Sequence, residues 1–306
     1  MKRDPAELQK EILALKEQTG ATILAHNYVD GAIQDIADFC GDSLELSIKA
    51  KKYKADLIVF CGVRFMAETA KILSPDSTVL HPNPYSGCPM ADMADPDAVA
   101  EYREKHPDTL IVAYVNTTAA TKTAVDLCCT SGNAEKLIAS LPPERKILFL
   151  PDANLGANLN AKLNRHMELW PGCCPTHNRI MPEHILAAKE KHPDALVLVH
   201  PECLPAVVRF ADWALSTGGM LKFVRESACR AFIIGTECGI LHRMRKENPD
   251  KAFYPLEPAV VCPNMKKITL EDVLFCLRDM TPEIELPEDV RRAAKAPIDR
   301  MLEALP

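Results

Sequence analysis

The sequence lacks the features that would assign the chain to a membrane or to nucleic acid. No apolar run approaches the ~18 residues that a membrane-spanning helix needs, and the first residues, Met1 to Glu7, lack the apolar stretch of a signal peptide. Positive charge is not in excess, because the 306 residues carry a net charge of −6; neither nucleic acid nor an anionic membrane surface is an expected partner. We therefore expect a cytoplasmic globular protein that binds any anionic ligand through local groups.

Cysteine, by contrast, is abundant, with 12 residues in the chain. Their spacing is not the dense spacing of a small secreted scaffold, and thiols stay reduced in the cytosol. Most of them fit the role of small buried apolar residues, but the number justifies a search for metal ligands.

One order of elements occurs three times along the chain. Helices predicted at 95–108 and 182–194 each contain Lys-His-Pro-Asp near the end, 86 residues apart, and each is followed by an apolar strand. An N-terminal helix before an apolar strand at 21–25 is the first copy. The second strands of the three copies are predicted at 57–60, 147–150 and 232–234. A fixed period of this kind indicates a repeat architecture.

Short apolar strands that alternate with helices predict parallel sheets with right-handed crossovers. We expect an α/β fold of three pseudo-threefold-related repeats, each a small three-stranded parallel sheet with flanking helices, around a central cavity. Ligands of such sheets bind beyond the carboxyl ends of the strands. The predicted boundaries are 1–93, 94–180 and 181–268 for the repeats and 269–306 for a C-terminal helical tail, with helices at Leu270–Met280 and Pro287–Leu305.

Three cysteines keep the period of the repeats. Cys88, Cys174 and Cys262 are spaced by 86 and 88 residues, and each is followed by proline. Three thiolates without a fourth suit an iron–sulfur cluster with one open iron, whereas a structural zinc ion prefers four closed ligands. His177 is available as a fourth ligand, and three buried core thiols are the structural alternative. We interpret the other cysteines as packing residues: 40, 61, 128, 129, 173, 203, 229, 238 and 276.

Three hydroxyl residues also share the period, namely Ser43, Ser131 and Thr217, each before a predicted helix. A single residue of this kind is usually only a helix cap. Helix N-termini offer free N–H groups and the positive end of the helix dipole, which bind carboxylate or phosphate. Three of them in register favour a pocket for a small, multiply anionic substrate.

Polar residues end the first strand of every repeat. They supply acid, base and hydrogen-bonding groups, although a histidine at a strand end is often only a satisfied core residue. Thr236, Glu237, His242 and Arg243 follow another strand and have weaker support. The strand-end residues are His26, Tyr28, Tyr114, Asn116, His200 and Glu202.

Several stretches together carry a resemblance to a known family. They are His26-Asn27-Tyr28, Gly41-Asp42-Ser43, residues 65–71 (FMAETAK), Tyr114-Val115-Asn116-Thr117, residues 130–134 (TSGNA), Trp170-Pro171-Gly172-Cys173-Cys174 with His177, His200-Pro201-Glu202, Ser216-Thr217-Gly218, Gly235-Thr236-Glu237 and residues 262–266 (CPNMK). With these motifs the chain resembles the quinolinate synthase family over essentially its full length.

The resemblance implies a [4Fe–4S] cluster on Cys88, Cys174 and Cys262. The family's tryptophan-x-glycine-x-cysteine-x-x-histidine pattern selects Cys174 rather than Cys173. Some members carry a C-x-x-C-x-x-C run near the last ligand, which this chain lacks. The substrate-binding residues that the resemblance implies are His26, Ser43, Tyr114, Val115, Asn116, Ser131, His200, Pro201, Glu202 and Thr217.

The implied activity is that of a transferase of NAD biosynthesis, which condenses iminosuccinate with dihydroxyacetone phosphate to quinolinate, phosphate and water. An open iron would act as Lewis acid. Glu202 and Tyr28 are the expected base and acid, and His26 and His200 are expected to orient the substrate. The resemblance also implies a link to an aspartate oxidase or dehydrogenase that supplies iminosuccinate.

Two alternatives remain at this stage. The diphthamide-forming radical enzymes resemble the same plan of three repeats and three cysteines, and would use S-adenosylmethionine at the open iron. The other alternative is a non-enzymatic protein that binds zinc.

Overall fold

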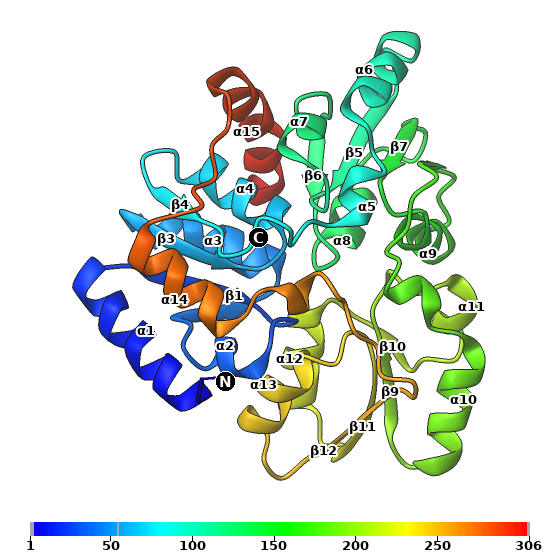
Figure 1. Cartoon of the computed structure of the whole chain (residues 1–306). Helices are drawn as coiled ribbons and strands as arrows, with labels where there is room; N and C mark the ends of the chain where they lie inside the picture. The colour runs from blue at the N-terminus through cyan, green and yellow to red at the C-terminus, as the bar shows by residue number, and fades with distance from the viewer. Residues whose placement is uncertain (1–2, 54, 305–306) are drawn as a thin grey trace. The chain divides into compact units, whose positions relative to one another are not determined.

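The computed structural model describes residues 3–53 and 55–304 and shows an α/β protein with three four-stranded sheets (Figure 1). All pairings within the sheets are parallel. The three repeated α/β units are therefore confirmed. The prediction of three strands in each repeat is wrong, because short edge strands complete every sheet to four.

The three sheets share one strand order. In each of them the first strand of the repeat lies between the second and third strands, and the fourth lies beyond the third. The first sheet contains β1 (Thr22–His26), β2 (Phe39–Gly41), β3 (Leu57–Cys61) and β4 (Thr78–Leu80); the second contains β5 (Leu110–Tyr114), β6 (Leu127–Cys129), β7 (Ile147–Leu150) and β8 (Glu168–Leu169); the third contains β9 (Leu196–Val199), β10 (Trp213–Ala214), β11 (Ala231–Gly235) and β12 (Ala252–Pro255).

An aspartate carboxylate fixes the first strand of each repeat at the same place. Asp38 accepts the N–H of Ile23 at 2.8 Å. Asp126 and Asp212 do the same for the equivalent strands, at 2.8 and 2.7 Å. The three aspartates are spaced by 88 and 86 residues, so the sequence period is also a period of hydrogen bonding.

The chain divides into two compact units. The first comprises the chain up to Cys88 together with Cys262–Lys295, and the second comprises Pro89–Val261 and the chain from Ala296 on. The second and third sheets thus belong to one unit. The predicted repeat boundaries and the central cavity stay predictions.

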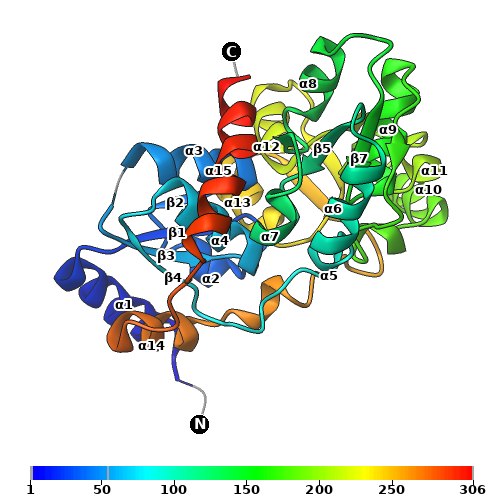
Figure 2. The same ribbon diagram turned by 90° about the horizontal axis from the view of Figure 1, so that it is seen from above.

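In the first unit, helices cover the sheet formed by β1 to β4. Helix α1 (Pro5–Thr19) starts at Asp4, whose side chain accepts the N–H of Ala6, and ends at Gly20 in the left-handed conformation (φ 67°) that glycine adopts without strain. It packs against α14, as Figure 2 shows. The other elements of this unit are α2 (Gly31–Gln34), α3 (Ser43–Tyr53), α4 (Arg64–Leu73), the 3₁₀ turn η2 (Met265–Lys267) and α14 (Leu270–Asp279).

A buried histidine follows β4 in this unit. The Nε2 atom of His81 lies 2.8 Å from the carbonyl oxygen of Gly62, to which it donates its proton. The Nδ1 atom has no hydrogen-bond partner among the described residues. Burial lowers the pKa of His81 below its usual value, so the ring is neutral at pH 7.

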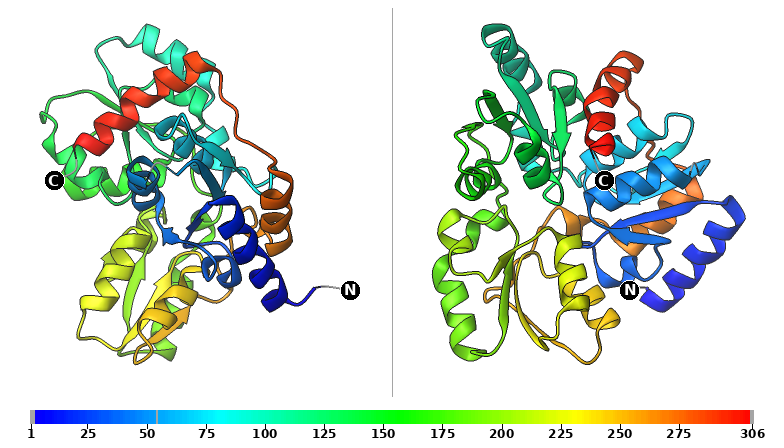
Figure 3. Two further views of the ribbon diagram at one scale, coloured as in Figure 1. Left: turned by 90° about the vertical axis from the view of Figure 1, so that its left-hand side faces the viewer. Right: turned by 180° about the vertical axis from the view of Figure 1, so that it is seen from behind.

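In the second unit, helices lie on both sides of the third sheet. Figure 3 shows α10 and α11 on one side of it and α12 and α13 on the other. Val197 and Val199 of β9, Ile233 of β11, Ile185 of α10 and Val207 of α11 form one buried core. The helices of this unit are α5 (Pro89–Asp92), α6 (Pro96–Lys105), α7 (Ala119–Lys122), α8 (Ala134–Ser140), α9 (Ala153–Leu163), η1 (His177–Arg179), α10 (Pro182–Lys191), α11 (Pro205–Val208), α12 (Thr217–Glu226) and α13 (Ile240–Glu247).

The last helix, α15 (Glu288–Glu303), confirms the second predicted helix of the C-terminal tail, and α14 confirms the first. Over the described residues, every helix is too short or too polar to span a lipid bilayer.

Candidate active site

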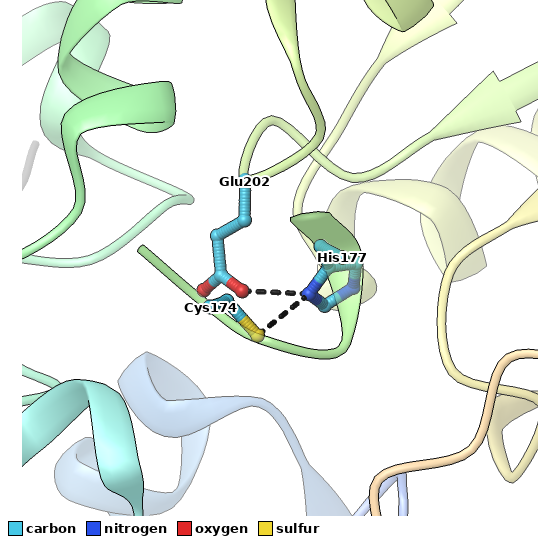
Figure 4. A group of neighbouring side chains, drawn as sticks. All are labelled: Cys174, His177 and Glu202. Carbon is cyan, nitrogen blue, oxygen red and sulfur yellow. Dashed lines mark hydrogen bonds and ion pairs between the residues drawn. The ribbon is translucent and has the colours of Figure 1, made fainter. Parts of the chain in front are cut away.

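Three side chains of the second unit converge just beyond the carboxyl end of β9. The His177 Nδ1 atom lies 3.2 Å from the Cys174 Sγ atom and 2.7 Å from the Glu202 Oε2 atom (Figure 4). One ligand atom of each residue lies within 4.8 Å of the others, a spacing at which a metal ion could be held. His177 and Glu202 are buried, and Cys174 is half-buried.

Local hydrogen bonds fix the cysteine. The Cys174 N–H donates to the Asp152 Oδ2 atom at 3.1 Å, and the Cys174 carbonyl oxygen accepts the Asn178 N–H at 2.9 Å. Asp152 also caps α9, because its Oδ1 atom accepts the Leu155 N–H at 2.8 Å. One fully buried carboxyl group thus joins the start of α9 to the loop that carries Cys174.

The carboxylate of Glu202 is the centre of a buried hydrogen-bond network. Tyr114 Oη, at the end of β5, donates to Glu202 Oε1 at 2.6 Å. The ring of His200 stacks on that of His177 with centroids 4.7 Å apart, and its Nδ1 atom lies 3.8 Å from Glu202 Oε2. The other ring nitrogen of His177 lies 2.7 Å from the hydroxyl of Thr236, which follows β11.

The network sets the protonation states. Burial alone would raise the pKa of Glu202, but His200, His177 and the hydrogen bonds from His177 and Tyr114 hold it well below its usual range. Burial lowers the pKa of His200 to about 3, and burial together with Glu202 raises that of Tyr114 well above its usual value. Burial and Glu202 raise the pKa of Asp152 to about 8. At pH 7 Glu202 is therefore a carboxylate, His200 a neutral imidazole and Tyr114 a phenol.

Six residues singled out in the sequence thus come together: Tyr114, Cys174, His177, His200, Glu202 and Thr236. Ser131 joins them, because its side-chain hydrogen bond with Tyr114 offsets part of the rise in the pKa of that phenol. Asn116, two residues beyond Tyr114, is half-buried, and its Oδ1 atom is buried without a hydrogen-bond partner among the described residues.

The three hydroxyl residues are not the helix caps. Asp42 caps α3 by accepting the N–H groups of Leu44 and Glu45, and Ser43 is the first helical residue. Ser216 caps α12, with Thr217 as its first residue. Ser131 precedes its helix as expected, since α8 begins at Ala134, whereas Ser43 and Thr217 are the first residues of their helices rather than residues before them. The cap function is thus separate from the hydroxyls that were predicted to bind substrate.

In the first unit, His26 and Tyr28 lie together at the end of β1. Their rings meet edge to face with centroids 4.6 Å apart, and the Tyr28 N–H donates to His26 Nδ1 at 3.2 Å. Lys266, four residues after Cys262, donates to the Tyr28 carbonyl oxygen at 2.5 Å and lies 3.7 Å from Asp30.

The segments that carry Cys88 and Cys262 are neighbours within this unit. The hydroxyl of Ser86 donates to the carbonyl oxygen of Asn264 at 2.8 Å. The side-chain amide of Asn83 donates to the backbone carbonyl oxygen of Lys267 at 3.0 Å. Both cysteines are half-buried. Each precedes a short helix, α5 and η2, as Cys174 precedes η1.

Five of the remaining cysteines are buried: Cys61, Cys128, Cys129, Cys203 and Cys276. Burial raises the pKa of all five thiols, to about 11 for Cys128 and about 12 for Cys276. Such thiols stay protonated, which fits packing rather than metal binding.

The sequence reasoning missed Asp152, and with it the asparagines of α9. Asn154 Nδ2 donates to Asn178 Oδ1 at 3.0 Å and to the Glu202 carbonyl oxygen at 3.3 Å. A signal was present, because Asp152 follows β7 as Thr236 follows β11, the equivalent strand of the next repeat.

The fold and this network define an α/β protein with an acid–base site beside a candidate metal ligand, at the carboxyl ends of parallel strands. Comparison with known proteins gives the family. The sequence profile of the family described as "Quinolinate synthetase A protein" matches residues 10–303. The chain is 52% identical over 297 residues to the quinolinate synthase of Pelobacter propionicus, covering 96% of this chain and 97% of that protein.

Two further relatives agree. The quinolinate synthase of Geotalea uraniireducens is 50% identical over 296 residues, covering 97% of each chain. That of Thermodesulfovibrio yellowstonii is 50% identical over 294 residues, covering 96% of this chain and 97% of the relative. The chain belongs to the quinolinate synthase family.

Proposed function

We propose that this protein is a transferase that condenses iminosuccinate with dihydroxyacetone phosphate to quinolinate, phosphate and water, in the biosynthesis of NAD. The observation that carries the proposal is the ionised Glu202 carboxylate, held by Tyr114 and His177 next to Cys174. It occurs in a chain about half identical to quinolinate synthases over nearly its full length.

A [4Fe–4S] cluster held by Cys88, Cys174 and Cys262 is part of the proposal. The donor set fits, because each thiol is half-buried and precedes a proline and a short helix. The five fully buried thiols are unsuitable, since their raised pKa values disfavour the thiolate. When bound, a cluster with one open iron supplies a Lewis acid for the loss of water.

Side chains of the protein supply the remaining functions, which are proton transfer and orientation of the substrate. Glu202 is the proposed base, because it is ionised, buried and connected to two proton-carrying groups, Tyr114 and His177. A neutral His200 orients substrate without adding charge. Tyr28 in the first unit is the proposed acid, and its neighbour His26 also orients substrate.

Anion binding is assigned to the helix starts and strand-end loops. Ser43 and Thr217 occupy the first turns of α3 and α12, where backbone N–H groups and the helix dipole favour carboxylate or phosphate. Ser131 adds a hydroxyl beside Tyr114. The other proposed contacts come from the strand-end loops, through Val115, Asn116 and Pro201. The proposed location is the cytoplasm, with substrate supplied by an enzyme that oxidises aspartate.

The test is anaerobic assay of quinolinate formation, with iron, sulfide and zinc measured in the same sample. We expect quinolinate and an iron-to-sulfide ratio of about one. Zinc without sulfide would favour a single ion on the Cys174, His177 and Glu202 group and would overturn the cluster. Binding of S-adenosylmethionine without quinolinate formation would overturn the activity.

A further inference from the structure

In the first repeat, one side chain donates hydrogen bonds to two backbone carbonyls of the loop that follows β1. The Nε2 atom of Gln34 donates to the carbonyl oxygen of Asn27 at 3.1 Å and to that of Val29 at 2.9 Å. These two carbonyls flank Tyr28, the proposed acid. Gln34 is the last residue of α2 and is buried.

The second repeat achieves the same geometry with a different group. Lys122, the last residue of α7, is only 1% exposed. Its Nζ atom donates to the carbonyl oxygens of Val115 and Thr117 at 2.8 and 2.5 Å, which flank Asn116. Lys122 lies 88 residues after Gln34, which is the spacing of His26 and Tyr114. The two side chains are therefore equivalent positions of the repeat.

The third repeat places an apolar residue, Val208, at this position, at the end of α11. The donor comes instead from α9. The Nδ2 atom of Asn158 donates to the carbonyl oxygens of Pro201 and Cys203, both at 2.9 Å, and these flank Glu202. The bonded carbonyl pair is thus retained even where the equivalent residue cannot donate.

Donors of two chemical kinds, the side-chain amides of Gln34 and Asn158 and the ammonium group of Lys122, therefore reach the equivalent pair of acceptors in the three repeats. A donor shared by these two carbonyls fixes the peptide plane before the central residue and the plane that follows its next neighbour, and so restricts the direction of the side chain between them. A buried ammonium group is unfavourable unless it is fully hydrogen-bonded. Packing alone therefore does not explain a buried lysine at position 122. What the repeats have in common is the residue that is held: Tyr28, Asn116 and Glu202.

We propose that Gln34, Lys122 and Asn158 are positioning residues, which fix Tyr28, Asn116 and Glu202 for substrate binding and turnover. This inference rests on the proposed function, which assigns those three residues to the active site.

The test compares Lys122→Met with Lys122→Gln in cluster-loaded protein. Methionine removes the hydrogen-bond donor, whereas glutamine is the donor at the equivalent position of the first repeat, Gln34. Lys122→Met should lower kcat/KM for quinolinate formation by up to about 100-fold, the effect of a misplacement of about 1 Å. Lys122→Gln should recover most of this loss. Lys162→Met is the matched control, because Lys162 is exposed and pairs only with Glu135 in the described structure; its kcat/KM should equal that of the parent.

Hydrogen exchange of residues 114–117 is measured on the same samples and does not depend on activity. Faster exchange in Lys122→Met, but not in Lys122→Gln or Lys162→Met, is expected. Unchanged exchange in Lys122→Met overturns the inference, as does a parent-like kcat/KM with only a lower Tm, which would make the lysine purely structural. An inactive parent would overturn the proposed function instead, and the exchange result would still decide whether Lys122 holds the loop.

If Lys122→Met does not fold, the reciprocal pair in the first repeat replaces it. Gln34→Leu should lower kcat/KM, and Gln34→Lys should retain it. Equal activity of the parent and both Gln34 variants would overturn the inference.

Discussion

Ser216 and Thr217 are neighbours at the start of α12, and together they separate helix capping from substrate binding. The Ser216 Oγ atom accepts the N–H of Gly219 at 3.1 Å, whereas Thr217 is the first helical residue and is buried. Ser216→Ala removes the cap at a cost of about 1 kcal/mol. In a unit of this size the Tm should fall by about 2–4 °C. Quinolinate affinity should stay close to that of the parent.

Thr217→Val has the opposite expected effect. Valine keeps the shape of threonine and removes the hydroxyl group. If that hydroxyl donates to a carboxylate of the ligand, its loss costs about 1.5–3 kcal/mol of binding, which is roughly a 10- to 100-fold loss of affinity. Thr217→Ser keeps the hydroxyl and should restore binding.

The assay is calorimetric titration of quinolinate into anaerobic, cluster-loaded protein, with Tm measured on the same samples. The expected pattern is weak binding by Thr217→Val and parent-like binding by Thr217→Ser and Ser216→Ala. If Thr217→Val binds quinolinate as the parent does, the hydroxyl is structural and the account of substrate recognition is wrong.

Three further predictions follow from the site and its surroundings. Glu202→Gln removes the buried carboxylate and should lower turnover by ~10²-fold or more at full cluster content, while Glu168→Gln, which neutralises an exposed carboxylate bonded to a tyrosine, should leave turnover unchanged; near-normal turnover of the first variant excludes Glu202 as base. Cys174→Ala should abolish bound iron and sulfide, whereas Cys173→Ala should retain both, and the reverse result would exchange the ligand. Because the folded-state pKa of His81 is lowered, the unfolded chain binds a proton first as pH falls below about 6.5, so stability decreases there by up to about 1.4 kcal/mol per pH unit; His81→Gln should reduce this slope in Tm against pH, and an unchanged slope would contradict the assignment.

The repeat could be predicted from the sequence because the residues that keep its period each have the same local structural function in every copy. Asp38, Asp126 and Asp212 keep one period since each fixes the start of a first strand. The edge strands were missed because they are too short to produce a pattern; β8 and β10 have two residues each. A two-residue strand is defined by its partner in the sheet rather than by its own sequence.

Part of the site was visible in the sequence for the same reason. Tyr114, His200 and Glu202 lie at the carboxyl ends of first strands in two different sheets, and ligands of parallel sheets bind beyond such ends. Asn158 was not visible, because its function depends on which loop packs against α9. Asn158 replaces a donor that the repeat position, Val208, cannot supply, and no period of the sequence reports such an exchange between elements.

Quinolinate formation, measured as a function of bound iron, distinguishes a reaction that depends on the cluster from one that the side chains carry out alone. Protein reconstituted anaerobically to a series of iron and sulfide contents is assayed with iminosuccinate and dihydroxyacetone phosphate. Turnover should rise in proportion to cluster content and vanish in protein stripped of iron. Quinolinate formation that is independent of iron, or absent from fully loaded protein, would contradict this expectation.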